Sequence, residues 1–113
     1  MNFDNNDLGV TRDSEKLICY LYHCFLKKRK NNISKSEAKE FKDDFFQNDK
    51  KLAKIDHNDI DDMLCELAEH GHIKYDIIGN VTLTNSLIAY MENRFKKGLA
   101  DVWEILSDFI PFS

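Results

Sequence analysis

The chain has 113 residues, of which 42% are apolar and 32% charged, a balance that suits one compact domain with a single core. No run approaches the roughly 20 apolar residues of a membrane span, and residues 1–10 lack the basic and apolar regions of a signal peptide. Cys19, Cys24 and Cys65 do not show the paired spacing of a disulfide framework. We therefore expect a cytoplasmic protein with free thiols and no membrane association.

The net charge of −4 is unevenly distributed. Residues 27–54 contain ten Lys and Arg and five Asp and Glu, whereas residues 56–76 contain seven acids and one Lys. The middle of the chain is thus divided into a basic half and an acidic half. Each half is a candidate binding surface.

Residues 1–13 are predicted to form a polar arm, and residues 14–113 a single domain. Asp13 or Ser14 can cap a first helix, which should end in the basic run of residues 27–30. Helical spacing predicts its core face, which consists of Leu17, Ile18, Leu21, Cys24 and Phe25.

A second helix is predicted from residue 34 to residue 48. Ser34 and Glu37 have the spacing of a capping box. Ala38, Phe41 and Phe45 would supply its apolar stripe. The connection that follows, to Ile55, is longer than the turn of a minimal helix-turn-helix.

A third helix is predicted to begin after Asp56, whose carboxylate can accept from free amides at a helix start. Its core face shows the i, i+3, i+4, i+7 spacing and consists of Ile60, Met63, Leu64 and Leu67. Gly71 follows the last turn, where a residue with positive φ is favoured.

A short β-hairpin follows the third helix. Ile73, Tyr75 and Ile77 alternate with polar residues, Gly79-Asn80 is a turn signal, and residues 81–83 alternate again. Thr84 can cap the next helix.

A long C-terminal helix is predicted from Thr84 to about Ile110, with Gly98 as a point where it can bend or break. Its apolar residues have a coiled-coil-like 3-4 spacing. Two alternatives follow: the second half folds back on the first helix, or it pairs with a second copy. The second alternative predicts a homodimer through Phe95, Leu99, Val102, Trp103, Leu106 and Phe109.

The order of these elements predicts an α+β fold, mainly α, with a three-helix core, a short hairpin wing and a long C-terminal helix. Leu64, Leu67, Gly71, Ile73 and the VTLT of residues 81–84 resemble the winged-helix superfamily. The tail, from residue 84 through Tyr90-Met91-Glu92 to Pro111, is similar to the YjcQ-type family of small winged-helix proteins from Gram-positive bacteria and their phages. The resemblance covers residues 14–111 and departs at Ser86-Leu87, where relatives usually have Gly. It implies a winged helix and a bacterial or phage origin, but function depends on the site.

The third helix usually enters the major groove in winged helices that bind DNA. Its predicted outward arc contains no Lys or Arg and consists of Asn58, Asp62, Cys65, Glu66 and Glu69. Each carboxylate near a phosphate costs on the order of 0.5–1 kcal/mol. We therefore predict a regulatory module that binds a protein partner through this acidic face.

The alternative is a transcriptional regulator, again a homodimer, that contacts the phosphates of double-stranded DNA through basic residues. These candidates are Lys27, Lys28, Arg29, Lys30, Lys35, Lys42, Lys50, Lys51, Lys54 and Lys74. Aromatic residues are not interleaved with these lysines along the chain, so a stacking platform for single strands is not predicted.

The sequence contains no catalytic constellation, phosphate loop or cofactor motif, so we do not expect an enzyme. His70 and His72, with Cys65, come nearest to a metal-binding set. Residues 65 and 70 diverge on a helix, however, and a fourth ligand is missing. No metal site is predicted.

Overall fold

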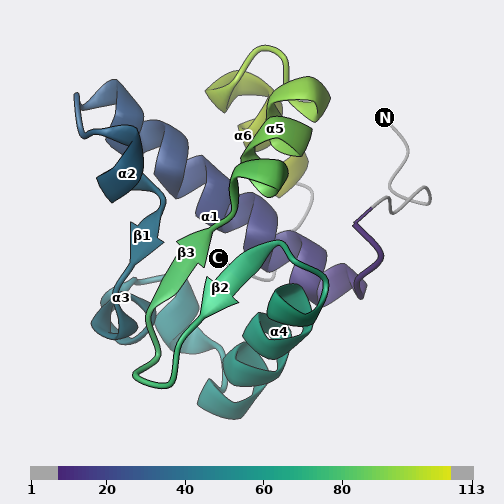
Figure 1. Cartoon of the computed structure of the whole chain (residues 1–113). Coiled ribbons are helices and arrows are strands. Elements are labelled where there is room, and N and C mark those ends of the chain that lie inside the picture. The colour runs from purple at the N-terminus through teal and green to yellow at the C-terminus, as the bar shows by residue number, and fades with distance from the viewer. Residues whose placement is uncertain (1–7, 108–113) are drawn as a thin grey trace.

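The computed structural model describes residues 8–107 and shows an α+β fold that is mainly helical (Figure 1). The elements in chain order are α1 (Arg12–Lys30), α2 (Lys35–Ala38), β1 (Glu40–Phe41), α3 (Asp43–Asn48), the 3₁₀ helix η1 (Leu52–Lys54), α4 (His57–Glu69), β2 (Ile73–Tyr75), β3 (Val81–Leu83), α5 (Asn85–Arg94) and α6 (Leu99–Ser107). None of the helices within residues 8–107 combines the length and the apolar character needed to cross a bilayer.

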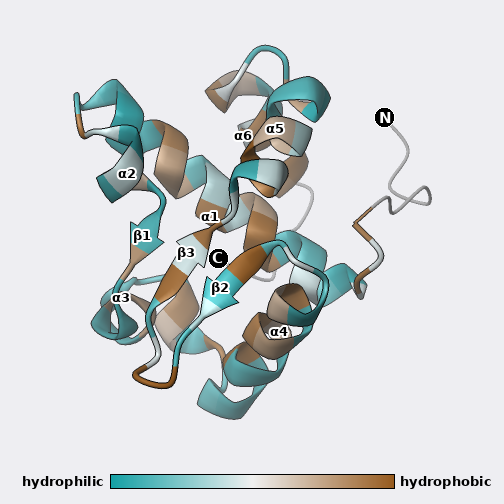
Figure 2. Cartoon of the chain, viewed as in Figure 1, coloured by the Kyte–Doolittle hydropathy of each residue, from teal (hydrophilic) through white to brown (hydrophobic). Residues whose placement is uncertain are grey.

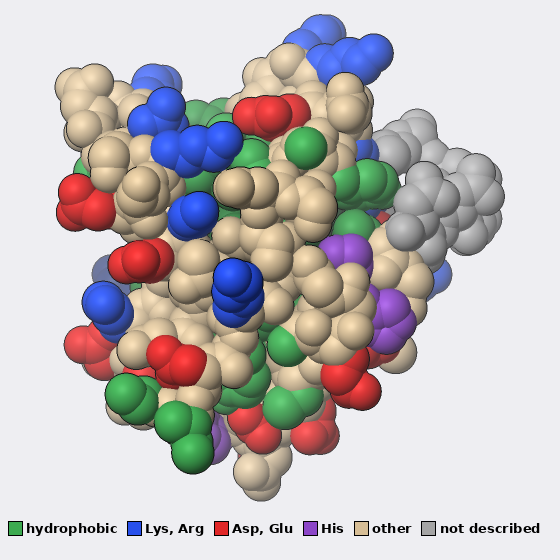
Figure 3. Space-filling view, in the orientation of Figure 1, with side chains coloured by type: hydrophobic (Ala, Val, Ile, Leu, Met, Phe, Trp, Pro, Cys, Tyr) green, Lys and Arg blue, Asp and Glu red, His purple; other side chains and the backbone are tan. Residues whose placement is uncertain are grey.

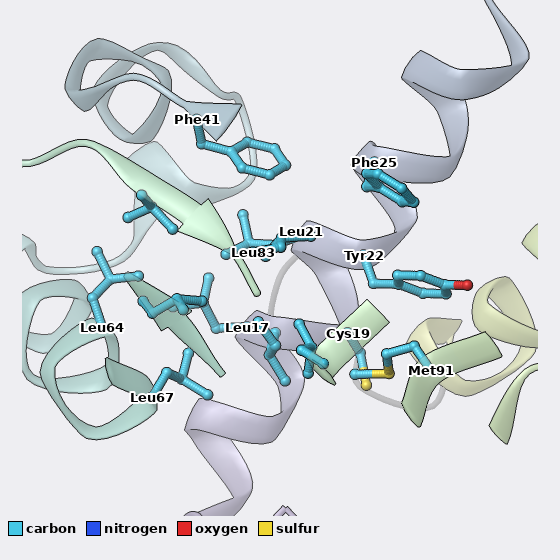
Figure 4. Close-up of a cluster of buried hydrophobic side chains, with 14 of the residues drawn as sticks. Leu17, Cys19, Leu21, Tyr22, Phe25, Phe41, Leu64, Leu67, Leu83 and Met91 are labelled. Carbon is cyan, nitrogen blue, oxygen red and sulfur yellow. The ribbon is translucent and has the colours of Figure 1, made fainter. Parts of the chain in front are cut away.

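Helix α1 is the central element, because it contacts α2, α4 and α6. Its residues Leu17 and Leu21 lie toward the sheet and α4, whereas Cys19 and Tyr22 lie toward Met91 of α5 (Figure 4). Apolar residues of the surrounding helices and strands are buried in one cluster with those of α1. Figure 2 shows the hydropathy of each residue along the ribbon. Since α1 is covered on more than one side, Cys19 and Tyr22 are buried in addition to most of the predicted face. Cys24, which was predicted to be core, is only partly buried.

The three strands form an antiparallel sheet in the order β1-β3-β2. The predicted hairpin is confirmed, with Ile73 opposite Leu83 and Tyr75 opposite Val81. Strand β2 ends at Tyr75, so Ile77 does not continue the alternation and is exposed together with Ile78.

The loop between β2 and β3 is organised by Asp76. Its Oδ1 accepts hydrogen bonds from the backbone N–H groups of Ile78, Gly79 and Asn80 at 2.8–3.0 Å. These bonds, the one from Asn80 first, lower the pKa of Asp76.

The prediction of one continuous helix over residues 34–48 is wrong in the middle of this segment. The segment divides into α2, β1 and α3, and Phe41 pairs with Val81 of β3. Its side chain is buried, so pairing with the sheet overrides the helical spacing of Ala38, Phe41 and Phe45. Phe46, which lies outside that spacing, is buried as well.

The prediction of a polar arm over residues 1–13 is wrong for its last residues. Leu8 and Val10 are buried in the core, and α1 begins at Arg12 rather than after Asp13 or Ser14. His72 Nε2 lies 2.8 Å from the backbone oxygen of Leu8. These contacts dock the segment before α1, whereas residues 1–7 lie outside the described part of the chain.

The prediction of one long C-terminal helix is also wrong, because α5 ends at Arg94 and α6 begins at Leu99. Gly98 adopts φ +67°, and its N–H donates to the Phe95 carbonyl at 2.9 Å. This turn folds α6 back on α1, which is the first of the two predicted alternatives (Figure 1).

A buried ion pair joins α5 to α1. Arg94 Nη1 lies 3.0 Å from Glu15 Oε2, and both side chains are almost fully buried. Burial raises the pKa of Glu15, and the charge of Arg94 offsets only part of this effect. Desolvation of both groups opposes the attraction within such a buried pair.

The local helix signals predicted at Ser34, Asp56, Gly71 and Thr84 are confirmed. Ser34 accepts from the Glu37 N–H, Asp56 from the Asn58 N–H and Thr84 from the Leu87 N–H. Gly71 has φ +77° directly after α4. These signals depend on residues a few positions apart, which explains why the sequence reveals them.

Candidate functional site: an acidic groove beside α4

The outward face of α4 is acidic. Within His57–Glu69 there is no Lys or Arg, and acidic side chains gather over this helix (Figure 3). Asn58, Asp62, Cys65 and Glu69 are exposed, as predicted, but Glu66 is partly buried.

The Glu66 carboxylate bonds to the start of α1. Its Oε2 accepts from the Thr11 N–H at 2.9 Å, and its Oε1 accepts from the Thr11 hydroxyl at 2.8 Å and from the Ser14 hydroxyl. Thr11 stands at the N-cap position of α1 but makes no side-chain cap of its own. Partial burial would raise the pKa of Glu66, but the hydrogen bonds from Ser14 and Thr11 outweigh it and lower the pKa below 4.5. The prediction of Glu66 as a free docking residue is therefore corrected.

Asp61, five residues earlier on α4, is also engaged within the chain. It accepts a hydrogen bond of 2.6 Å from the Tyr75 hydroxyl. Burial and this bond raise the pKa of Tyr75. The α4 carboxylates thus divide into those that bond to the chain itself and those that face outward.

A groove of about 480 Å³ lies between the start of α1 and α4. Its lining residues are Thr11, Asp13, Ser14, Lys16, Ile55, Asp59, Asp62, Met63 and Glu66. Among these described residues Lys16 is the only cation, and its Nζ lies 3.6 Å from Asp13 Oδ1. Ile55 and Met63 are partly buried and supply apolar surface. The groove is therefore both acidic and partly apolar.

Asp62 and Glu66 of this groove were predicted as interaction residues, whereas Asp13 and Ile55 were not. The groove forms where two segments distant in sequence meet, and no local spacing indicates such a meeting. Met63 was assigned to the core, yet its side chain lines the groove at the edge of the core.

The predicted basic surface is partly occupied by internal contacts. Lys28 Nζ donates to the Glu40 carbonyl at 2.8 Å and lies 3.9 Å from the Phe41 ring centroid. Burial lowers the pKa of Lys28. Arg29 Nη1 donates to the Ile33 carbonyl at 3.1 Å. The other predicted cations except Lys51 are exposed, and Figure 3 shows several basic side chains over α2 and β1, away from the acidic α4.

The predicted dimerisation residues are largely inside the chain. Phe95, Val102 and Leu106 are buried, because α6 packs on α1. Leu99 is partly buried and Trp103 is exposed. Phe109 lies outside the described residues. The 3-4 seam is therefore not a free surface within residues 84–107.

His70 and His72 bind the backbone. His70 Nδ1 lies 3.0 Å from the Glu66 carbonyl oxygen, and His72 bonds to Leu8 as described above. Within residues 8–107 no group of three or more His, Cys, Asp or Glu side chains is arranged to hold a metal ion. Slight desolvation and the carboxylates of Asp61 and Asp62 raise the pKa of Cys65, which works against a reactive thiolate.

The chain matches no protein-family model, and comparisons with curated proteins and with solved structures found no match. Inference about function therefore rests on the geometry of the site.

Proposed function

We propose that this chain is a small winged-helix regulatory module, without catalytic activity, that binds a basic segment of a protein partner in the groove between α1 and α4. The order of elements supports the winged-helix assignment. The helices α1 to α4 precede the β2–β3 hairpin, and β1 completes the sheet beside β3. Three free cysteines support a location in the cytoplasm.

The observation that carries this proposal is the pairing of acidic and apolar surface in one groove. Lys and Arg side chains bury their aliphatic stems on apolar surface while the charged head stays in a polar environment. Ile55 and Met63 offer that surface beside the carboxylates of Asp59 and Asp62. An exposed ion pair contributes only about 0.2–1 kcal/mol, so useful affinity requires several contacts along a segment.

The alternative, a regulator that contacts the phosphates of duplex DNA through the Lys-rich residues 27–54, is less well supported, because Lys28 and Arg29 already bond to backbone carbonyls of the chain. Reading of the major groove by α4 is disfavoured as well. Helix α4 carries five acids and no cation. Phosphates beside these carboxylates would oppose the counterion release that drives most DNA binding.

The test uses a labelled synthetic peptide in which arginine alternates with leucine, titrated by fluorescence anisotropy at low and high salt. We expect saturable binding that weakens with salt. The double substitution Asp59→Lys with Asp62→Lys should reduce affinity on the order of tenfold or more, since each reversed charge near the peptide costs about 1 kcal/mol.

The matched control is Glu92→Lys with Glu104→Lys, which changes the net charge equally but at exposed positions on α5 and α6. This control should retain most of the affinity. Equal losses in both double variants would show a general charge effect and contradict the groove. A peptide with glutamate in place of arginine should not bind.

A further inference from the structure

Trp103, the single tryptophan of the chain, is 53% exposed on α6. Its ring centroid lies 5.8 Å from that of His23 on α1, and Lys51 Nζ lies 5.4 Å from the Trp103 ring centroid. Lys27 follows His23 by one helical turn and so lies on the same side of α1. The indole of Trp103, on α6, thus lies next to lysines from two other segments, α1 and the residues before η1.

The charges of Lys27 and Lys51 both act on His23, which lies beside Trp103. Burial first, and then the charges of Lys27 and Lys51, lower the pKa of His23. Its Nδ1 atom is buried and has no hydrogen-bond partner within residues 8–107. A neutral imidazole therefore supports the indole while the two ammonium groups supply the charge.

The packing of α6 on α1 does not depend on Trp103. Val102 and Leu106 are buried and attach the helix to α1, whereas the indole, a large apolar surface, remains exposed. A single exposed aromatic is unremarkable on a protein surface. An exposed aromatic within cation–π distance of a lysine, with a second lysine nearby, is a specific combination that fits a ligand with a flat ring and a negative charge.

We propose that Trp103, Lys27 and Lys51 form a stacking site for single-stranded nucleic acid, in which one base stacks on the indole and the lysines contact adjacent phosphates. Stacking on an aromatic side chain contributes about 1–3 kcal/mol per base and tolerates any base, since each has a π-face. In a duplex the base faces are occupied by their neighbours, so a single strand is the better fit.

This site is separate from the acidic groove, because Trp103, Lys27 and Lys51 do not line it. A stacking platform was not predicted, because aromatic residues are not interleaved with the lysines along the chain. Folding places Trp103 of α6 beside Lys51, which precedes η1.

The experiment uses the intrinsic fluorescence of Trp103, which reports on the site without a label. Thymidine oligonucleotide is titrated into the full chain at low and high salt, and we expect saturable quenching that weakens as salt rises. An abasic strand of equal length and charge should bind about 5- to 100-fold more weakly, since it lacks the stacking contribution. A duplex should also bind more weakly.

Variants are compared by anisotropy of a labelled strand. Trp103→Ala should lower affinity at least about fivefold, whereas Trp103→Phe should retain a large part of it. Lys27→Ala with Lys51→Ala should weaken binding and reduce the salt slope by about 1.4, at about 0.7 per phosphate contact. The matched control, Lys96→Ala with Lys97→Ala, removes two exposed cations between α5 and α6 and should leave affinity unchanged.

Four outcomes with nucleic acid would overturn this proposal. They are absence of quenching at low salt, equal affinity for the abasic strand, equal loss in the control pair, and tighter binding of the duplex. Equal quenching by a glutamate-rich peptide would also overturn it and would assign the patch to an acidic protein. Circular dichroism of each variant separates loss of binding from loss of fold.

Discussion

At the scale of single residues, the carboxylates of α4 differ in role because different segments lie opposite them. Glu66 meets the start of α1 and caps it, and Asp61 meets the Tyr75 hydroxyl. Asp59 and Asp62 line the groove and are exposed. The outward positions of an acidic helix are therefore not equivalent, and only some are available to a partner.

The cap role of Glu66 predicts a stability effect. Glu66→Ala should lower the free energy of unfolding by about 1 kcal/mol, as loss of an N-cap does, measured by urea denaturation. Glu69→Ala, an exposed acid one turn further along α4, should change it by less than about 0.5 kcal/mol. Equal effects would mean that the bonds to Thr11 and Ser14 contribute nothing.

The same cap predicts a pH dependence. The folded-state pKa of Glu66 lies below its ordinary value of 4.5, so its stabilising contribution is present above that value. It is lost as the pH falls through the folded-state pKa. The stability difference between the wild type and Glu66→Gln should therefore shrink on acidification, and a difference that grows would contradict the charged cap.

At the scale of elements, the starts of α1 and α3 depend on residues distant in sequence. Asn80 Oδ1, from the β2–β3 loop, accepts from the Asp43 N–H at 3.1 Å, while Lys42 at the N-cap position of α3 makes no cap. Glu66 of α4 likewise caps the start of α1 by accepting from Thr11. Sequence analysis finds caps such as Ser34, because cap and amide lie within a few residues, but long-range caps have no local signature.

Strand β1 shows the same limit on prediction from sequence. Residues 38, 41 and 45 fit a helical stripe, and two of their side chains, Ala38 and Phe41, are buried as the stripe requires. The burial was therefore predictable, but the backbone was not. A two-residue strand is specified by its partner β3, which lies forty residues later at Val81 and Thr82.

The break between α5 and α6 predicts the sign of a substitution. Gly98 has φ +67°, which costs a residue with a Cβ about 1–2 kcal/mol, so Gly98→Ala should destabilise the chain by about that amount. In a continuous helix the same substitution would raise the free energy of unfolding by about 1 kcal/mol. Urea denaturation decides between the two.

Gly71 is the matched comparison for Gly98. It has φ +77° and, like Gly98, has no atom within 4 Å of an added Cβ, so the two alanine variants should lose similar stability. A stabilising Gly98→Ala beside a destabilising Gly71→Ala would mean that α5 and α6 are continuous.

At the scale of the whole molecule, α1 joins the two parts of the chain. Leu17 and Leu21 face the sheet and α4, whereas Glu15 and Tyr22 contact the C-terminal part through Arg94 and Phe95. Within residues 84–107, the seam residues Val102 and Leu106 are buried where α6 packs on α1, as the fold-back alternative requires. Periodicity cannot tell, however, whether the covering surface belongs to the same chain or to a second copy.

The internal seam predicts how the protein responds to loss of Leu106. Its side chain is buried on α6, so Leu106→Ala should lower the free energy of unfolding by about 2 kcal/mol, the lower end for a core leucine because α6 lies at the edge of the core. Trp103→Ala, at an exposed position on the same helix, should lower the free energy of unfolding by much less. If α6 packs within one chain, the urea midpoints of the wild type and of Leu106→Ala do not change with protein concentration. A midpoint that rises with concentration would show that association stabilises the fold, and it would assign the seam to an interface between two copies.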